Sequence, residues 1–238
     1  MSTLYVVATP IGNLEDLTFR ALRILKEVDF ILCEDTRTTK KLLEHYGIKT
    51  QTLSYHQYSR LQKIEYIIQL LERGKNLALV SDAGTPGISD PGNKLISLIV
   101  ENLKNVKIIP IPGASAGITA ASISGFPMEK FVFLGFPPAK KKRKKFFEEV
   151  LNSKYPVIFY ESPYRIVKTL NELGIKVAEA KPHLPSRLRL ANKELRIVVC
   201  RELTKKFETV YRGTIEEVIK QIEKDIIKGE FVVIVDKA

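Results

Sequence analysis

The chain has 238 residues, of which 45% are hydrophobic, and its 38 Lys and Arg exceed its 27 Asp and Glu to give a formal net charge of +11. This apolar content excludes a chain that is disordered throughout. The uncharged stretch at residues 108–128 holds three Pro and three Gly, which makes it unsuitable as a membrane helix. We therefore expect a basic globular protein with an anionic partner, and nucleic acid is the commonest such partner.

In the first half of the chain, short apolar runs alternate with amphipathic stretches. Strands are expected at residues 4–8, 30–33, 77–80 and 106–109. One helix is expected to begin after Thr18 and another after Thr36, each with that threonine as its N-cap. Two more helices are expected at residues 59–73 and 92–102. Alternation of this kind predicts α/β layers around a largely parallel sheet.

The second half begins with a helix of small residues at 115–124. Further strands are expected at residues 131–134, 157–160, 195–200, 208–211 and 231–235, and further helices at residues 140–151, 163–173 and 214–227. The short connection between strands 195–200 and 208–211 fits an antiparallel pair, so this sheet should be mixed. We expect two α/β domains, residues 1–113 and 114–238, with an irregular excursion at residues 176–194.

Cysteine and histidine usage favours a reducing compartment without a metal site. Cys33 and Cys200 are too few for a disulfide framework, and neither has a CxxC partner. The sequence opens on a strand-like run with no signal-peptide pattern, so we expect a cytoplasmic protein that does not bind membranes. His45, His56 and His183 lack the spacing of metal ligands.

Three loops rich in Gly and Pro follow predicted strands, at residues 9–14, 83–92 and 111–116. In open α/β sheets, ligands bind at the edge where strands end, and glycine lets a ligand approach the backbone. Ordinary tight turns are the alternative, but three Gly and two Pro in the ten residues 83–92 specify more shape than one turn needs. No dinucleotide or P-loop phosphate motif is present.

Carboxylates follow three of the predicted strands, and each has a cation close by in the sequence. The candidates for an acid, a base or an orienting group are the carboxylates Asp35, Glu161 and Glu202. The candidates for binding phosphates are the cations Arg37, Arg165 and Arg201. For the first of these groups the alternative is that Asp35 or Thr36 caps a helix while Arg37 is solvated. The residues alone do not choose among the three carboxylates.

A run of six cations precedes Phe146 and Phe147: Lys140, Lys141, Lys142, Arg143, Lys144 and Lys145. Cations at a helix start oppose the helix dipole, which suggests that a partner compensates them. We expect contacts with the phosphates of a nucleic acid, and a solvated helix start is the alternative.

Five segments together resemble the bacterial family of small-subunit ribosomal RNA cytidine 2′-O-methyltransferases, which belongs to the tetrapyrrole methylase superfamily. They read LYVVATPIGNL at 4–14, CEDTR at 33–37, SDAGTPGISDPG at 81–92, FYES at 159–162 and RELTK at 201–205. The resemblance implies two α/β domains, S-adenosylmethionine in the cleft between them, a homodimer, and small-subunit ribosomal RNA as the substrate.

Carried over by motif, the resemblance implies that cofactor-binding residues are Pro10, Ala83, Gly84, Thr85, Ile88, Ser115, Ala116, Leu134 and Leu203. Two other functions stay open at this point. One is a methylase of the same fold acting on a tetrapyrrole, which is also polyanionic. The other is an RNA-binding assembly factor without catalysis, which would not need three intact ligand loops.

Overall fold

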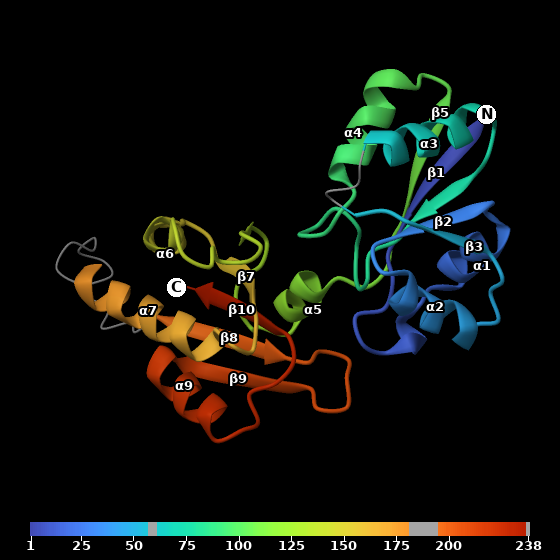
Figure 1. Cartoon of the computed structure of the whole chain (residues 1–238). Helices are drawn as coiled ribbons and strands as arrows, with labels where there is room; N and C mark the ends of the chain where they lie inside the picture. Colours follow the sequence, from blue (N-terminus) through green and yellow to red (C-terminus); the bar gives the residue numbers. More distant parts are fainter. Residues whose placement is uncertain (57–60, 181–194, 237–238) are drawn as a thin grey trace. The chain divides into compact units, whose positions relative to one another are not determined.

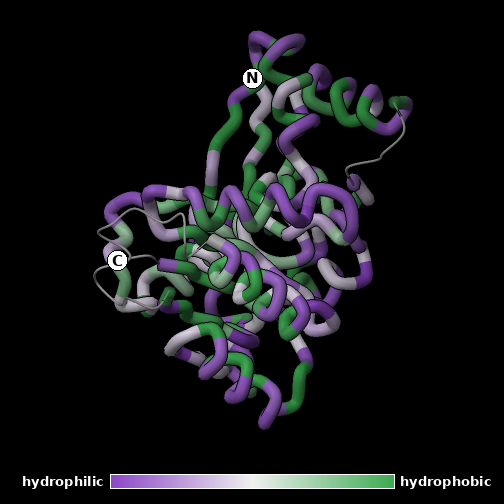
Figure 2. The backbone as a smooth tube through the Cα atoms, turned by 90° about the vertical axis from the view of Figure 1, so that its left-hand side faces the viewer, coloured by the Kyte–Doolittle hydropathy of each residue, from purple (hydrophilic) through white to green (hydrophobic). Residues whose placement is uncertain are grey.

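The computed structural model describes residues 1–56, 61–180 and 195–236 (Figure 1). The chain divides into two compact units, Met1–Ser115 and Ala116–Ala238. In Figure 2 the helices alternate hydrophilic and hydrophobic segments, as expected where one helix face packs on a sheet. No helix in the described ranges is both long and apolar enough to cross a membrane.

The first unit is built on a parallel sheet. Among the described residues its strands are β1 (Ser2–Val7), β2 (Phe30–Cys33), β3 (Gln51–Ser54), β4 (Leu77–Leu79) and β5 (Val106–Ile111), in the order β3-β2-β4-β1-β5. Every neighbouring pair runs parallel. The carboxyl ends of all five strands therefore meet at one edge, and the prediction of a parallel sheet is confirmed.

Helices cover both faces of this sheet because the strands alternate their apolar side chains between the two (Figure 1). Helices α1 (Phe19–Glu27) and α2 (Thr36–His45) pack on the face that presents Val7 and Ile31. Helices α3 (Leu61–Glu72) and α4 (Asn93–Asn102) pack on the face that presents Leu4 and Leu32. A short 3-10 helix, η1 (Leu14–Asp16), follows the first strand.

Two details of the first unit differ from the sequence prediction. Strand β3 was not predicted, because its sequence QTLS lacks an apolar run. It lies at the sheet edge and pairs with β2 alone, so it needs little apolar side chain. The second difference is the cap of α2, which is Asp35 and not Thr36: the Asp35 side chain accepts from the N–H of Arg37.

The second unit contains a mixed sheet, as predicted. Its described strands are β6 (Val132–Phe133), β7 (Val157–Glu161), β8 (Arg196–Arg201), β9 (Thr209–Thr214) and β10 (Phe231–Asp236), in the order β6-β7-β10-β8-β9. Only β6 and β7 run parallel among these pairs, and β8 with β9 forms the expected antiparallel pair.

Helices α6 (Arg143–Asn152), α7 (Ile166–Ala180) and α9 (Ile215–Glu223) share one apolar core with this sheet, formed around Phe147, Phe159 and Val233. Helix α5 (Ala116–Ser122) packs against β7 and β10, and the N–H of Gly117 donates to the Tyr160 hydroxyl at 3.1 Å.

Helix bounds in the second unit correct two predictions. Helix α6 begins at Arg143, so residues 140–142 precede the helix. Helix α7 continues to Ala180, so the first part of the stretch expected to be irregular is helical. The rest of that stretch, residues 181–194 with His183, lies outside the described residues.

Candidate functional site

The three Gly/Pro loops of the first unit lie at the same edge of the parallel sheet, because they follow the adjacent strands β4, β1 and β5. Thr9 and Gly84 join the first two loops through a pair of backbone hydrogen bonds, 2.9 Å from the Thr9 N–H and 3.0 Å from the Gly84 N–H. The Thr85 hydroxyl donates to the Ala114 carbonyl at 3.1 Å, and this bond joins the third loop to the second. The loops therefore form one connected structure.

A left-handed backbone at Gly84 and a close contact at Gly113 explain why glycine stands at two positions of these loops. Gly84 has φ +81°, a conformation that costs an L-residue about 1–2 kcal/mol. A Cβ on Gly113 would lie 3.0 Å from the Cβ of Ala8, so the third loop packs directly on the end of β1. A side chain at position 113 would push the third loop away from Ala8, and one at position 84 would strain the backbone.

Six of the residues assigned to the cofactor by resemblance belong to this loop structure. They are Pro10, Ala83, Gly84, Thr85, Ile88 and Ser115. Ile88 is 48% exposed, a large apolar side chain facing solvent within an otherwise folded loop. The Gly84 N–H and C=O are already paired with Thr9, so a ligand would reach the main-chain groups of the partly exposed Ala83 and Thr85. Such a donor set fits S-adenosylmethionine, which carries hydroxyl, amino and carboxylate groups.

The other three residues assigned to the cofactor lie in the second unit. Ala116 begins α5, Leu134 follows β6 and is partly buried, and Leu203 is 6% exposed. Leu203 stands between Glu202 at φ +51° and Thr204 at φ +67°. Left-handed backbone at non-glycine residues costs roughly 1–3 kcal/mol and clusters at functional sites.

The Asp35 side chain is held by hydrogen bonds from Arg37. Its carboxylate accepts from the Arg37 N–H at 2.8 Å and from the Arg37 guanidinium at 2.7 Å. These side-chain and backbone hydrogen bonds lower the pKa of Asp35 to about 2. A carboxylate with so low a pKa is a weak base, and its geometry is that of a helix cap.

Glu34, one residue earlier, has the opposite environment. Burial and the nearby Asp82 carboxylate raise the pKa of Glu34. Asp82 accepts from the Asp35 N–H at 3.1 Å, and this bond holds the end of β2 beside the loop after β4. Sequence reasoning passed over Glu34 in favour of Asp35. The signal that could have found it is its place directly after the last buried residue of the strand.

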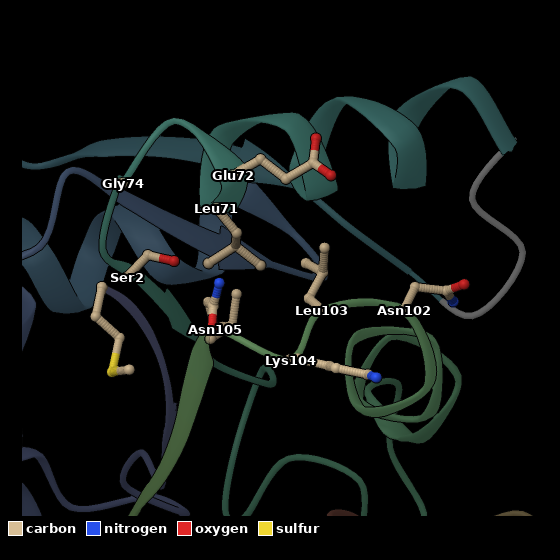
Figure 3. A pocket seen from close by; sticks show the side chains of 10 residues that line it. Ser2, Leu71, Glu72, Gly74, Asn102, Leu103, Lys104 and Asn105 are labelled. Carbon is tan, nitrogen blue, oxygen red and sulfur yellow. The ribbon is translucent and has the colours of Figure 1, made fainter.

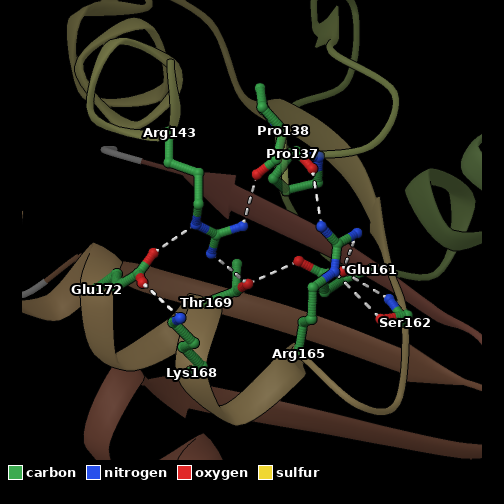
Figure 4. A network of polar contacts seen from close by, with 9 residues as sticks. All are labelled: Pro137, Pro138, Arg143, Glu161, Ser162, Arg165, Lys168, Thr169 and Glu172. Carbon is green, nitrogen blue, oxygen red and sulfur yellow. Dashed lines mark hydrogen bonds and ion pairs between the residues drawn. The ribbon is translucent and has the colours of Figure 1, made fainter. Parts of the chain in front are cut away.

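Glu161 is a structural carboxylate in this geometry (Figure 4). Its side chain is fully buried and accepts from the Ser162 N–H at 2.7 Å and from the Thr169 hydroxyl at 2.6 Å. The Arg165 guanidinium lies 2.8 Å away and donates as well to the Pro137 carbonyl at 3.2 Å. These contacts join the end of β7, the start of α7 and the loop after β6.

Arg143 belongs to the same network and not to the exposed part of the basic run. Its residue exposure is 9%, and it donates to Glu172 at 2.7 Å, to Thr169 at 2.8 Å and to the Pro138 carbonyl at 3.0 Å (Figure 4). The other five cations of the run are exposed. The run is therefore five exposed lysines with a buried arginine that anchors them.

Glu202 and Arg201 are also engaged within the second unit. Burial raises the pKa of Glu202, but hydrogen bonds from Lys205 at 2.8 Å and from the Glu230 N–H at 3.1 Å outweigh it and leave the pKa below its ordinary value. Arg201 is 6% exposed and pairs with Asp225 at 2.9 Å. Neither arrangement resembles an open phosphate or proton-transfer site.

A separate hollow of about 440 Å³ lies at the opposite edge of the first sheet, where β1 and β5 begin (Figure 3). It is lined largely by exposed side chains such as Glu72 and Lys104. Within the described ranges no group of three or more His, Cys, Asp or Glu could hold a metal ion.

The sequence matches known proteins over nearly its whole length. The family model of the tetrapyrrole (corrin/porphyrin) methylases matches residues 3–219. The chain is 47% identical over 98% of its length to a protein of Halalkalibacterium halodurans named ribosomal RNA small subunit methyltransferase I, and it covers 75% of that protein. Proteins of the same name from Bacillus subtilis and Synechocystis are 46% and 41% identical over 99% of the chain, which covers 75% and 79% of them.

Solved structures show the same fold. A cobalt precorrin-4 methyltransferase superimposes with a TM-score of 0.66 at 15% identity, over 98% of this chain and 94% of the other. A diphthine synthase gives 0.66 at 14% identity, over 99% and 90%. The fold therefore serves different substrates, while the sequence is far closer to the ribosomal RNA enzymes. The chain belongs to the tetrapyrrole (corrin/porphyrin) methylase family.

Proposed function

We propose that this chain is a cytoplasmic methyltransferase that uses S-adenosylmethionine to methylate the ribose 2′-hydroxyl of a cytidine in small-subunit ribosomal RNA, acting as a homodimer. The observation that carries the proposal is identity of 41–47% over nearly the whole chain with proteins named for that substrate. The exposed lysine run supports a long phosphate backbone over a compact tetrapyrrole. The cytidine, the 2′-oxygen and the dimer rest on the sequence resemblance.

The cofactor supplies a methyl group on a positively charged sulfur, which is already activated for displacement. The chain can therefore contribute mainly positioning, worth up to about 7–11 kcal/mol. We propose that Ala83–Ile88 and Ser115 hold the cofactor in the first unit, together with Pro10. Ala116, Leu134 and Leu203 are the candidates in the second unit. The hydrogen bonds from Thr9 and Thr85 keep the loops in place before a ligand arrives.

For the base that accepts the hydroxyl proton we propose Glu34 in place of Asp35, Glu161 or Glu202. Arg37 lowers the pKa of Asp35 to about 2, and Glu161 is fully enclosed by its partners. Glu34 lies at the ligand edge of the sheet beside Asp82, and its raised pKa makes it the better proton acceptor.

Glu34→Gln is expected to slow single-turnover methyl transfer by roughly 100-fold or more while cofactor affinity stays unchanged. Wild-type rates should rise with pH through the raised pKa of Glu34, because only the ionised carboxylate accepts a proton, and the variant should lose that limb. The matched control is Asp35→Asn, which should stay within a few-fold of wild type because Asn caps helices almost as well as Asp. A Glu34→Gln rate within threefold of wild type would remove Glu34 from the mechanism.

Replacing Lys140, Lys141, Lys142, Lys144 and Lys145 with Gln is expected to weaken RNA binding without changing cofactor affinity. The plot of log affinity against log salt should flatten by roughly 0.7–0.9 per lost phosphate contact. Arg143 stays unchanged in this variant because it is buried. Arg201 is buried as well, so we no longer propose it as an RNA contact. An unchanged salt slope would mean that the run is only a solvated helix start.

Transfer of radiolabelled methyl groups to isolated small ribosomal subunits, with a precorrin as competitor substrate, tests the proposed function. We expect label in the RNA and no inhibition by the precorrin. Label in the precorrin alone would indicate a tetrapyrrole methylase, and label in neither would indicate a binding protein without catalysis.

A further inference from the structure

Among the described residues of the second unit, three aromatic side chains are more than half exposed: Tyr164, Phe136 and Phe207. Tyr164 and Phe136 are the two whose loops a hydrogen bond joins. Tyr164 is 95% exposed and Phe136 is 53% exposed. Tyr164 lies in the turn between β7 and α7, and Phe136 lies in the loop after β6. A single exposed ring needs no explanation, but rings beside clustered cations form the kind of surface that binds nucleic acid.

The polar network holds these two loops side by side. Arg165, next to Tyr164, donates to the carbonyl of Pro137, which is next to Phe136, at 3.2 Å (Figure 4). The turn is also closed internally, since the N–H groups of Arg165 and Ile166 both donate to the Ser162 carbonyl at 3.1 Å. Tyr164 and Phe136 are thus displayed from neighbouring, rigidly held backbone.

Arg143 holds the start of the lysine run close to the loop that carries Phe136. It donates to the carbonyl of Pro138, two residues from Phe136 and two from Lys140 (Figure 4). Lys140, Lys141 and Lys142 are exposed and directly precede it. Lys168, four residues after Tyr164 and in the first turn of α7, has a side chain that is 69% exposed and lies 3.9 Å from Glu172. We call Phe136, Lys140, Lys141, Lys142, Tyr164 and Lys168 the aromatic–lysine surface.

Aromatic faces among cations are the chemistry that single-stranded nucleic acid requires. Unpaired bases stack on the rings while ammonium groups contact the phosphates. In a duplex the bases are already stacked and paired, so the rings find no partner. We propose that the aromatic–lysine surface binds an unpaired segment of the RNA substrate by stacking on Tyr164 and Phe136. This inference rests on the proposed function only in taking RNA as the substrate.

Fluorescence anisotropy with a labelled, unstructured cytidine-containing 12-nucleotide RNA tests this inference on the full chain. Tyr164→Ala and Phe136→Ala are each expected to weaken binding by roughly 5- to 150-fold, because stacking on one ring contributes about that much. The salt slope should stay unchanged, since neither ring carries charge. Tyr164→Phe, which keeps the ring, should restore most of the affinity, and a duplex of the same sequence should bind all variants equally.

The matched control is Phe19→Ala, because Phe19 is 93% exposed but lies in the first unit without the lysine run. Binding of Tyr164→Ala within twofold of wild type, or equal losses for single strand and duplex, would overturn the inference. So would sedimentation that shows Tyr164→Ala breaking an oligomer with RNA affinity intact, since a second copy would then cover this surface. A chain that needs Tyr164 to bind the single strand but transfers no methyl group would leave this inference standing and refute the proposed function.

Discussion

Replacement of Glu161 with Ala is expected to lower the free energy of unfolding by about 3–5 kcal/mol, the usual cost of breaking a buried ion pair from one side. The substitution leaves the Arg165 guanidinium without its carboxylate and leaves the Thr169 hydroxyl and the Ser162 N–H without their acceptor. The loss should fall on the second unit, where the network joins β7, α7 and the loop after β6.

Denaturant unfolding with hydrogen exchange resolved by peptide would measure both the size and the place of this effect. Glu148→Ala is the matched control: Glu148 pairs with Lys144 at 4.0 Å in α6 of the same unit, and the two side chains are 50% and 75% exposed. We expect it to cost at most about 1 kcal/mol. A Glu161→Ala variant that loses no more than this control would show that the network does not hold the unit together.

Gly84→Val is expected to abolish S-adenosylmethionine binding, because a branched side chain would fill the space that a ligand at this loop needs. Valine is strained at φ +81°, and its Cβ would lie 3.4 Å from the Cγ2 of Ile11 before its two methyl groups are added. Movement of residue 84 also disturbs the paired hydrogen bonds with Thr9. Calorimetric titration with the cofactor measures the loss.

The control for backbone strain is Gly74→Val. Gly74 has φ +80°, nearly the same conformation, but a Cβ there meets no atom within 4 Å. It lies between α3 and β4, at the opposite edge of the sheet. Both variants should lose the stability that the strained φ costs, Gly84→Val should lose more through its contact with Ile11, and only Gly84→Val should lose the cofactor. Unchanged cofactor affinity in folded Gly84→Val would refute the assignment of this loop.

Apolar periodicity predicted the parallel sheet because strands such as β1 and β4 are buried on both faces and carry continuous apolar residues. It failed at β3, an edge strand whose polar sequence is indistinguishable from a loop. The ligand loops were visible as Gly/Pro clusters. The hydrogen bonds that join them, such as Thr85 to Ala114, depend on strand order, which local sequence does not contain.

Side-chain roles were harder to predict than elements. The sequence shows six consecutive cations at residues 140–145, which we interpreted as one basic run. In the structure Arg143 lies on the helix face of the buried Phe146, Phe147 and Val150. The spacing i, i+3, i+4 and i+7 was available in the sequence and would have separated this arginine from the exposed lysines. The place of Glu34 directly after the strand was visible in the sequence, but its raised pKa depends on burial and on Asp82, which is distant in the chain.

Nucleoside mass spectrometry of small-subunit ribosomal RNA, after incubation of under-methylated subunits with the purified chain and S-adenosylmethionine, tests the central claim most directly. The proposed function predicts a gain of one 2′-O-methylcytidine per subunit, absent without enzyme and absent with Gly84→Val. A methyl group found on a base, or RNA that gains no methyl group while the folded chain binds the cofactor, would contradict the account.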